Sequence, residues 1–430
     1  MTLKLLAVGD LHLGRRPTRL PADRVARADD YSPAEAWRRS VDLAIREGVE
    51  AVLLAGDVVE SRYDYFEALP RLQTGVAALA RAGIQTFVVS GNHDVNVLPP
   101  LIDRVPNAHL LGRDGQWEAV QLGGNERSGG QQATLWGWSF PAERVRHSPL
   151  AQLPADRGSG PRLGLLHCDR DQADSPYAPV TSEALRDTRF DAWLLGHIHQ
   201  PDRLDGHNPS GYLGSVVGLD AGEPGARGPW LIDIADGQIQ RFEHRPLAPL
   251  RWDRIDVDIG GTTSEGEVVQ RLNTRLEALA RVVDTTDDRP DLMGLRLRFV
   301  GDCDLTETDI EPAVPKPNHS MGLPGVDGSI QWFVESWRID TRPVTPLSRL
   351  AERDDQPGLL ARRLLVLERD AADAERLALL EAADRHLQGM PGHAGWSQLP
   401  GPWPDRQTLA DWLRESGQNA LRAMLAQERN

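Results

Sequence analysis

Five short apolar runs lie within the first 200 residues, and each is followed closely by residues that can bind a metal ion. Such runs, separated by stretches with helical spacing, predict the buried strands of an α/β fold. The runs are 3–8, 51–55, 84–90, 163–166 and 193–195, and helices are expected at 34–47 and 66–82. Because ligands bind at the carboxyl ends of strands in open α/β sheets, we expect these polar residues to meet at one edge.

The polar residues form five motifs in a fixed order. They read Asp10-Leu11-His12, Gly56-Asp57, Gly91-Asn92-His93-Asp94, His167 and Gly196-His197-Ile198-His199. Side chains two positions apart on an extended segment point to the same side, so the first and last motifs can each present two ligands. Each motif alone is more typical of an ordinary loop or turn. All five together, each after an expected strand, predict a metal site.

Seven of these side chains are of metal-ligand type, namely Asp10, His12, Asp57, Asn92, His167, His197 and His199. Mixed nitrogen and oxygen donors without a thiolate suit Mn, Fe or Zn better than Ca²⁺ or a structural zinc. Seven ligands exceed one tetrahedral site but suit two adjacent ions that share a carboxylate. Two ions about 3.5–4 Å apart are the usual arrangement for phosphoryl displacement. We expect two divalent ions, Mn²⁺ first, with Fe, Zn or Mg as alternatives.

This order of motifs resembles that of the calcineurin-like metallophosphoesterase superfamily over residues 3–200. The opening Asp10-Leu11-His12-Leu13-Gly14 is similar to its DNA-repair exonuclease branch, the SbcD/YhaO-like proteins. The stretches 211–215 and 222–234 are similar to the segment that closes the nuclease core of that branch. The resemblance implies a four-layer α/β/β/α sandwich, with a small α+β cap domain and a helical C-terminal region.

The resemblance also implies a role for each residue of the site. One ion would be held by Asp10, His12 and His199, the other by Asn92, His167 and His197, with Asp57 bridging them. His93 would be the general acid, and Asp94 would orient its ring or stabilise its charged form. After the bridging residue the chain reads Val58-Val59-Glu60, where the branch usually has Leu-Phe followed by Asp or His. Because of this departure, the resemblance does not say which residues surround the metal ligands or position the substrate, but it does assign the ligands themselves.

The spacing of apolar residues changes near residues 245 and 345, so we expect three parts of the chain. They are a nuclease core at 1–245, an α+β capping domain at 246–345 and a helical region at 346–430. Leu409, Trp412 and Leu421 lie near one face of the last expected helix, which predicts either an internal core or a docking surface. Trp332 and Trp337 in the cap are read as packing residues, with base stacking as the alternative. Arg15, Arg16 and Arg19, just after the first motif, are candidate phosphate contacts, with an ordinary solvated loop as the alternative.

The formal net charge of −15 argues against a protein that holds nucleic acid by bulk positive charge. With two cysteines, of which Cys168 is expected to be a buried thiol rather than a ligand, a reducing cytoplasm is the expected location. No apolar run reaches about 18 residues, so no membrane-spanning helix is expected.

The leading interpretation is a Mn-dependent DNA exonuclease, with additional endonuclease activity left open, that acts in DNA repair with an SbcC-like coiled-coil ATPase. The alternatives are a phosphodiesterase for a small nucleotide or other phosphoester, and a structural or regulatory subunit of an ATPase complex. The sequence leaves open whether two copies pair as a homodimer.

Overall fold

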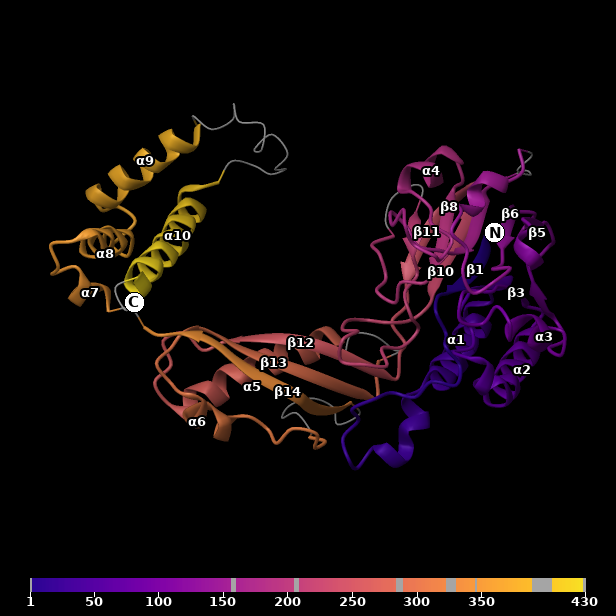
Figure 1. The fold of residues 1–430 in the computed structure, drawn as a ribbon, viewed down its shortest axis with the longest axis horizontal. Helices are drawn as coiled ribbons and strands as arrows, with labels where there is room; N and C mark the ends of the chain where they lie inside the picture. The colour runs from indigo at the N-terminus through magenta and orange to yellow at the C-terminus, as the bar shows by residue number, and fades with distance from the viewer. Residues whose placement is uncertain are drawn as a thin grey trace. The chain divides into compact units, whose positions relative to one another are not determined.

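The computed structural model describes residues 2–155, 160–204, 209–283, 289–321, 330–344, 346–388 and 404–427 (Figure 1). The chain divides into two compact units. The first runs from the N-terminus to Val300 and includes Leu305–Asp340, and the second comprises Gly301–Asp304 and Thr341–Asn430. Each unit is described by itself below.

The first unit contains a six-stranded sheet in the order β11-β10-β1-β2-β3-β4. Its strands are β1 (Leu3–Val8), β2 (Ala51–Ala55), β3 (Gln85–Val89), β4 (Ala108–Leu110), β10 (Trp230–Ala235) and β11 (Gln238–His244). The first four are parallel, and β10 joins β1 in the antiparallel sense. One face is covered by α1 (Pro33–Glu47), α2 (Tyr65–Arg81) and α3 (Leu98–Ile102). Helix α1 begins after Ser32 and ends at Gly48, which has a φ of 65°, so its bounds agree with the helix expected at 34–47.

A five-stranded sheet, ordered β5-β6-β7-β8-β9, packs against the other face. Its strands are β5 (Glu118–Gly123), β6 (Gln132–Trp138), β7 (Arg162–His167), β8 (Ala192–Gly196) and β9 (Ser210–Tyr212). Leu5 and Leu53 of the first sheet and Leu135 and Leu165 of the second lie in one buried cluster between them. The outer face of the second sheet packs against α4 (Ser182–Asp187) and the loops around it. The expected mixed α/β fold with two facing sheets is confirmed.

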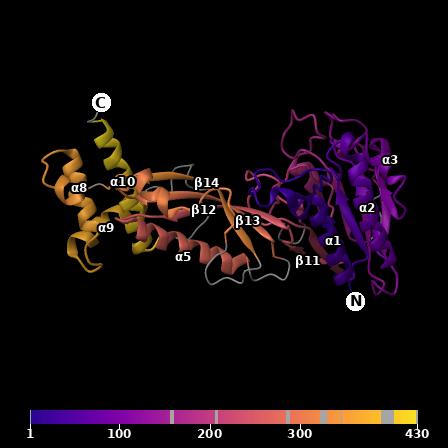
Figure 2. The same cartoon turned by 90° about the horizontal axis from the view of Figure 1, so that it is seen from below.

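A three-stranded sheet, β12-β13-β14, completes the first unit. It is formed by β12 (Leu250–Asp258), β13 (Leu292–Asp302) and β14 (Gln331–Arg342), and α5 (Glu265–Val283) lies along one of its faces (Figure 2). The short α6 (Glu307–Ile310) follows β13. We call this sheet and its helices the cap. The boundary expected at 245 stays a prediction, because the cap belongs to the same compact unit as the two large sheets.

The contacts between the cap and the core include one buried carboxylate and one buried indole. Glu335 accepts hydrogen bonds from Arg19 Nη1 at 2.6 Å and from Arg296 Nε at 2.7 Å. The indole of Trp252 donates to the carbonyl of Gly218 at 3.0 Å and lies 5.4 Å from the ring of Phe333. Arg19 is therefore engaged in a contact between core and cap, which its expected role as a phosphate contact did not anticipate.

The packing interpretation is supported for Trp332 and stays a prediction for Trp337, which is only partly buried. Trp332 is fully buried, so it is closed to a base. The ring of Trp337 lies 6.1 Å from that of Phe299 in an edge-to-face arrangement.

The second unit is helical. It contains α7 (Leu347–Leu350), α8 (Gln356–Leu367), α9 (Ala374–Gln388) and α10 (Arg406–Gln427). Leu409 and Leu421 of α10 are buried with Leu364 of α8, as expected for an internal core. Trp412, on the same expected stripe, remains half-exposed. No helix in the described ranges combines the length and apolarity that crossing a lipid bilayer requires.

Glu335 gives a test of the contact between core and cap. Burial raises the pKa of this carboxyl, but the hydrogen bonds from Arg296, Ser336 and Arg19 outweigh that effect and lower it from 4.5 to about 2. A lowered folded-state pKa stabilises the protein above about pH 4.5 and loses that contribution as the pH falls towards 2. We expect Glu335→Gln to lower the free energy of unfolding by about 2 kcal/mol at neutral pH, with the difference from wild type shrinking below pH 4.5.

Thermal and urea unfolding between pH 7 and pH 3 would measure this difference. Asp42→Asn is the matched control, because Asp42 pairs with Arg38 on the exposed surface of α1, where such pairs contribute about 0–1 kcal/mol. Equal, pH-independent losses in both variants would contradict a buried carboxylate that joins the cap to the core.

Candidate metal centre

The carboxyl ends of strands from both large sheets place the predicted ligands. Asp10 and Asp57 follow the neighbouring parallel strands β1 and β2, and Asn92 follows β3. His167 is the last residue of β7, and His197 comes directly after β8, the parallel neighbour of β7. The two facing sheets therefore present their ligand-bearing ends at one place.

The backbone turns sharply where it carries these side chains. His12, Asp57 and His197 have positive φ angles of 48°, 45° and 109°. Such angles are uncommon outside glycine, and they cluster at functional sites. A Cβ on Gly91 would lie 2.1 Å from Oδ1 of Asp57, and one on Gly196 would lie 2.0 Å from the carbonyl oxygen of Ala55. The glycines of the motifs are thus required by close approach to the site.

Two groups of ligand atoms form the centre. Asp10, His12 and His199 make the first, and Asp10, Asp57 and His167 the second, with the atoms of each group within 4.8 Å of one another. Nε2 of His167 lies 3.3 Å from Oδ2 of Asp57 and 3.1 Å from Oδ1 of Asn92. Six of the seven predicted ligands therefore come together.

His197 lies beside these groups. Its ring centre is 5.2 Å from that of His167, its backbone N–H donates to Oδ1 of Asp10 at 2.9 Å, and its Nε2 lies 3.5 Å from Oδ2 of Asp169. With Nε2 directed at Asp169, Nδ1 is the nitrogen available to an ion. The sequence analysis did not single out Asp169, although it lies two positions after His167.

The second nitrogen of each histidine in the two groups has an oxygen partner. Nδ1 of His12 lies 2.6 Å from Oε2 of Glu60, and Nδ1 of His199 lies 2.6 Å from Oε1 of Glu223. Nδ1 of His167 lies 3.1 Å from the carbonyl oxygen of Ala55. Such partners fix the ring orientation and leave Nε2 as the metal-binding atom.

These residues fit a bound cation. Nε2 of His12 and Nε2 of His199 face each other at 3.0 Å. If both Nδ1 atoms carry the protons directed at Glu60 and Glu223, two neutral rings turn their lone pairs towards the same point. Oδ2 of Asp10 is buried without a hydrogen-bond partner among the described residues. Buried polar atoms are normally satisfied, so these atoms are arranged for a positively charged ligand.

The electrostatics of the site agree with this conclusion. Burial lowers the pKa of His167, but the charge and hydrogen bond of Asp57, the charge of Asp10 and the hydrogen bond to the carbonyl of Ala55 together outweigh burial and raise that pKa to about 9. Burial also lowers the pKa of His12, and the hydrogen bond to Glu60 with the charges of Asp57 and Asp10 raises it overall. Carboxylates that favour protonated imidazoles in this way create a negative potential that attracts cations.

His93 lies at the edge of the site with its side chain 44% exposed. Its ring centre is 5.5 Å from that of His12, and its backbone N–H donates to Oδ1 of Asp57 at 3.1 Å. Nδ1 lies 3.3 Å from the carbonyl oxygen of Glu60. The ring of His93 is thus exposed to solvent directly beside the ligand groups.

Asp94 differs from its expected role. Its two oxygens accept hydrogen bonds from the backbone N–H groups of Gly91 at 2.8 Å and Val58 at 2.7 Å. Burial and then the charge of Asp57 raise its pKa to about 7. We expected Asp94 to orient the ring of His93 or to stabilise its charged form. Its hydrogen bonds instead tie the loop after β3 to the loop after β2, and the second role stays a prediction. The group that contacts the ring of His93 is the backbone carbonyl of Glu60.

Two further residues support the site without having been assigned a role from the sequence. Glu223 contacts His199 and also accepts from the backbone N–H of Leu219 at 3.1 Å. Arg227 is buried and donates to the carbonyl of His199 and, at 3.0 Å, to Gln200. Both lie in the 222–234 stretch that carries the resemblance, which was the available signal. Cys168 is a buried thiol whose pKa is raised by burial, as expected.

A comparison with protein families decides the identity of this region. Residues 3–201 match the model of the calcineurin-like phosphoesterases. The chain carries a calcineurin-like phosphoesterase domain. The match covers all seven predicted ligands and both large sheets as far as β8, so the expected calcineurin-like phosphoesterase domain is confirmed.

Three curated relatives place the phosphoesterase domain among similar proteins. The chain is 26% identical to "Uncharacterized metallophosphoesterase YhaO" of Bacillus subtilis, over 60% of this chain and 63% of that protein. It is 30% identical to the DNA double-strand break repair protein Mre11 of Haloferax volcanii, over 63% of this chain and 58% of that protein. It is 25% identical to a subunit of the SbcCD nuclease of Rhodobacter capsulatus, over 66% of this chain and 78% of that protein. The chain thus spans about three fifths of the first two.

The contact between Glu223 and His199 can be tested by metal binding. We expect Glu223→Ala to weaken Mn²⁺ affinity about 10–100-fold, because His199 loses the partner that fixes its ring. Glu223→Gln keeps an acceptor without the charge and should fall in between. Calorimetric titration of Mn²⁺ into metal-stripped protein would measure both, and Glu126→Ala, at an exposed loop position, is the control. Unchanged affinity in Glu223→Ala would show that this carboxylate does not support a ligand.

Proposed function

We propose that the chain is a metal-dependent DNA exonuclease that hydrolyses phosphodiester bonds with two bound divalent ions, most suitably Mn²⁺. The observation that carries this proposal is the meeting of two ligand groups that share Asp10 at the joined edges of two sheets. The names of two relatives, a DNA double-strand break repair protein and a nuclease subunit, support DNA as the substrate.

The roles proposed for the residues are those that the family resemblance implies. Asp10, His12 and His199 would hold one ion and Asn92, His167 and His197 the other, with Asp57 shared between them. The ions would bind phosphate oxygens and lower the pKa of a water molecule that attacks phosphorus. His93, exposed beside the ligands, donates a proton to the departing sugar oxygen. Glu60, through its contact with His12 and its carbonyl at the ring of His93, holds both rings in place.

A pocket of about 550 Å³ opens beside His93 and is also lined by Asn92, Asn96, Tyr63 and Arg144. A volume of this size holds a single nucleotide or another small ligand. This observation favours a phosphodiesterase for small nucleotides as the second candidate. In the leading proposal, the same pocket receives the end of a DNA strand.

Partner and location belong to the same proposal. One relative is named as part of an SbcCD nuclease, so we propose that an SbcC-like coiled-coil ATPase binds this chain in a reducing cytoplasm. The helical unit is the expected docking site, because Trp412 and Leu359 are exposed apolar side chains there. Loss of co-purification with such an ATPase in Trp412→Ala would support this site, and undiminished co-purification would exclude Trp412 from it.

The substrate is tested with the purified chain and Mn²⁺. An exonuclease degrades linear DNA and leaves covalently closed circular DNA intact, while a small chromogenic phosphodiester reports the metal centre alone. We expect cleavage of linear DNA and of the chromogenic ester, both abolished by a chelator. Cleavage of the chromogenic ester without any DNA degradation would favour the small-nucleotide candidate.

The role of His93 is tested by His93→Ala. We expect both ions to remain bound while hydrolysis of DNA falls about 10²–10⁴-fold, the contribution of one general acid. Metal content and single-turnover cleavage should be measured on the same preparation. His109→Ala, which removes an exposed histidine stacked on Phe87, is the control. Normal turnover of a metal-replete His93→Ala protein would remove His93 from the mechanism.

A further inference from the structure

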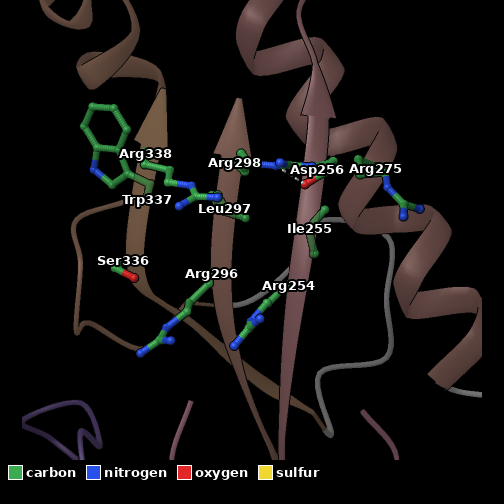
Figure 3. A pocket seen from close by; sticks show the side chains of 10 residues that line it. All are labelled: Arg254, Ile255, Asp256, Arg275, Arg296, Leu297, Arg298, Ser336, Trp337 and Arg338. Carbon is green, nitrogen blue, oxygen red and sulfur yellow. Dashed lines mark hydrogen bonds and ion pairs between the residues drawn. The ribbon is translucent and has the colours of Figure 1, made fainter. Parts of the chain in front are cut away.

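The cap carries an arginine-lined pocket of about 790 Å³ that includes none of the predicted metal ligands (Figure 3). Five arginines and one acidic residue, Asp256, line it. The arginines are Arg254 on β12, Arg296 and Arg298 on β13, Arg338 on β14 and Arg275 on α5. In a chain with a net charge of −15, such a concentration of positive charge is local and needs an explanation.

The strand register places these charges next to one another. β12 and β13 are parallel, with Arg254 opposite Arg296 and Asp256 opposite Arg298. Side chains alternate along the strands, so Ile255 and Leu297 are buried while Arg254 and Arg338 are exposed. Like charges directly opposite each other destabilise a sheet. Glu335 offsets the charge of Arg296 in this pair, whereas Arg254 has no ion pair within the described ranges.

Only two of the five arginines use their charge in ion pairs among the residues that the structure describes. Arg296 binds Glu335 at the contact between core and cap, and Arg298 binds Asp256 and, at 3.4 Å, Asp340. Arg254, Arg275 and Arg338 have no ion pair within the described ranges. Figure 3 shows that these three come from different elements on either side of the paired ones. They are available to bind an external anion.

We propose that this pocket binds the sugar–phosphate backbone of DNA, independently of base sequence. A guanidinium group can form bidentate hydrogen bonds with phosphate oxygens, which an ammonium group cannot. The inference rests on the proposed function, because it assumes that the anion bound in this pocket is the DNA that the metal centre hydrolyses. A chain that is acidic overall needs a local cationic surface to retain DNA while the metal centre acts on one phosphodiester.

The test replaces the three unpaired arginines together, as Arg254→Gln, Arg275→Gln and Arg338→Gln, in the full chain. We expect the affinity for DNA, measured by fluorescence anisotropy with chelator present to prevent cleavage, to fall at least 10-fold. The slope of log K against log salt concentration should become shallower, by the amount expected for the loss of up to about three phosphate contacts. Hydrolysis of the small chromogenic phosphodiester with Mn²⁺ should be unchanged, because the pocket contains no metal ligand.

The control removes the same charge elsewhere, as Arg81→Gln, Arg104→Gln and Arg186→Gln, three exposed arginines outside the cap. We expect this triple variant to bind DNA as wild type does. Equal loss in both triple variants would overturn the proposal, since net charge rather than the pocket would then govern binding, and so would undiminished binding in the cap variant. Failure of wild type to cleave any DNA, with intact hydrolysis of the chromogenic ester, would instead refute the proposed function.

Discussion

Two buried carboxylates, Asp10 and Asp57, at the joined edges of two sheets are the constraint on which the rest of the site depends. An unpaired buried charge is costly, so their surroundings must supply positive charge or hydrogen-bond donors. His167 lies next to both, and backbone N–H groups of His93 and His197 donate to them. One oxygen of Asp10 still lacks a partner among the described residues. A bound cation would supply the missing partner for this oxygen and offset the negative charge of both carboxylates.

The surrounding fold serves to hold this charge in place. Parallel strands from two facing sheets bring the ligands to one edge, and glycines let the loops approach closely. Glu60, Glu223 and the carbonyl of Ala55 fix the histidine rings, and each leaves Nε2 directed at the site. Asp94 ties two of the ligand loops together. The cap adds a separate cationic surface, which suits a long anionic substrate better than a small one.

Much of the site was predictable because strand ends are local signals. Apolar runs that stop at Asp, Asn or His marked the strands and the ligands together, and both sheets follow that reading. The contacts of Glu223, Asp169 and Arg227 could not be derived from spacing, because each depends on a loop that returns from elsewhere in the chain. The hydrogen bonds of Asp94 were not anticipated for the same reason, since they go to the backbone of Gly91 and Val58 and not to its sequence neighbour His93. The pairing of Arg19 with Glu335 joins residues 316 positions apart.

The most direct test of the account is anomalous scattering from crystals grown or soaked with Mn²⁺. The account predicts two adjacent manganese peaks, one near His12 and His199 and the other near His167 and Asn92, with Asp57 between them. A single peak would contradict the two-ion arrangement. A density map without manganese at these residues would contradict the metal centre, and the proposed hydrolysis with it.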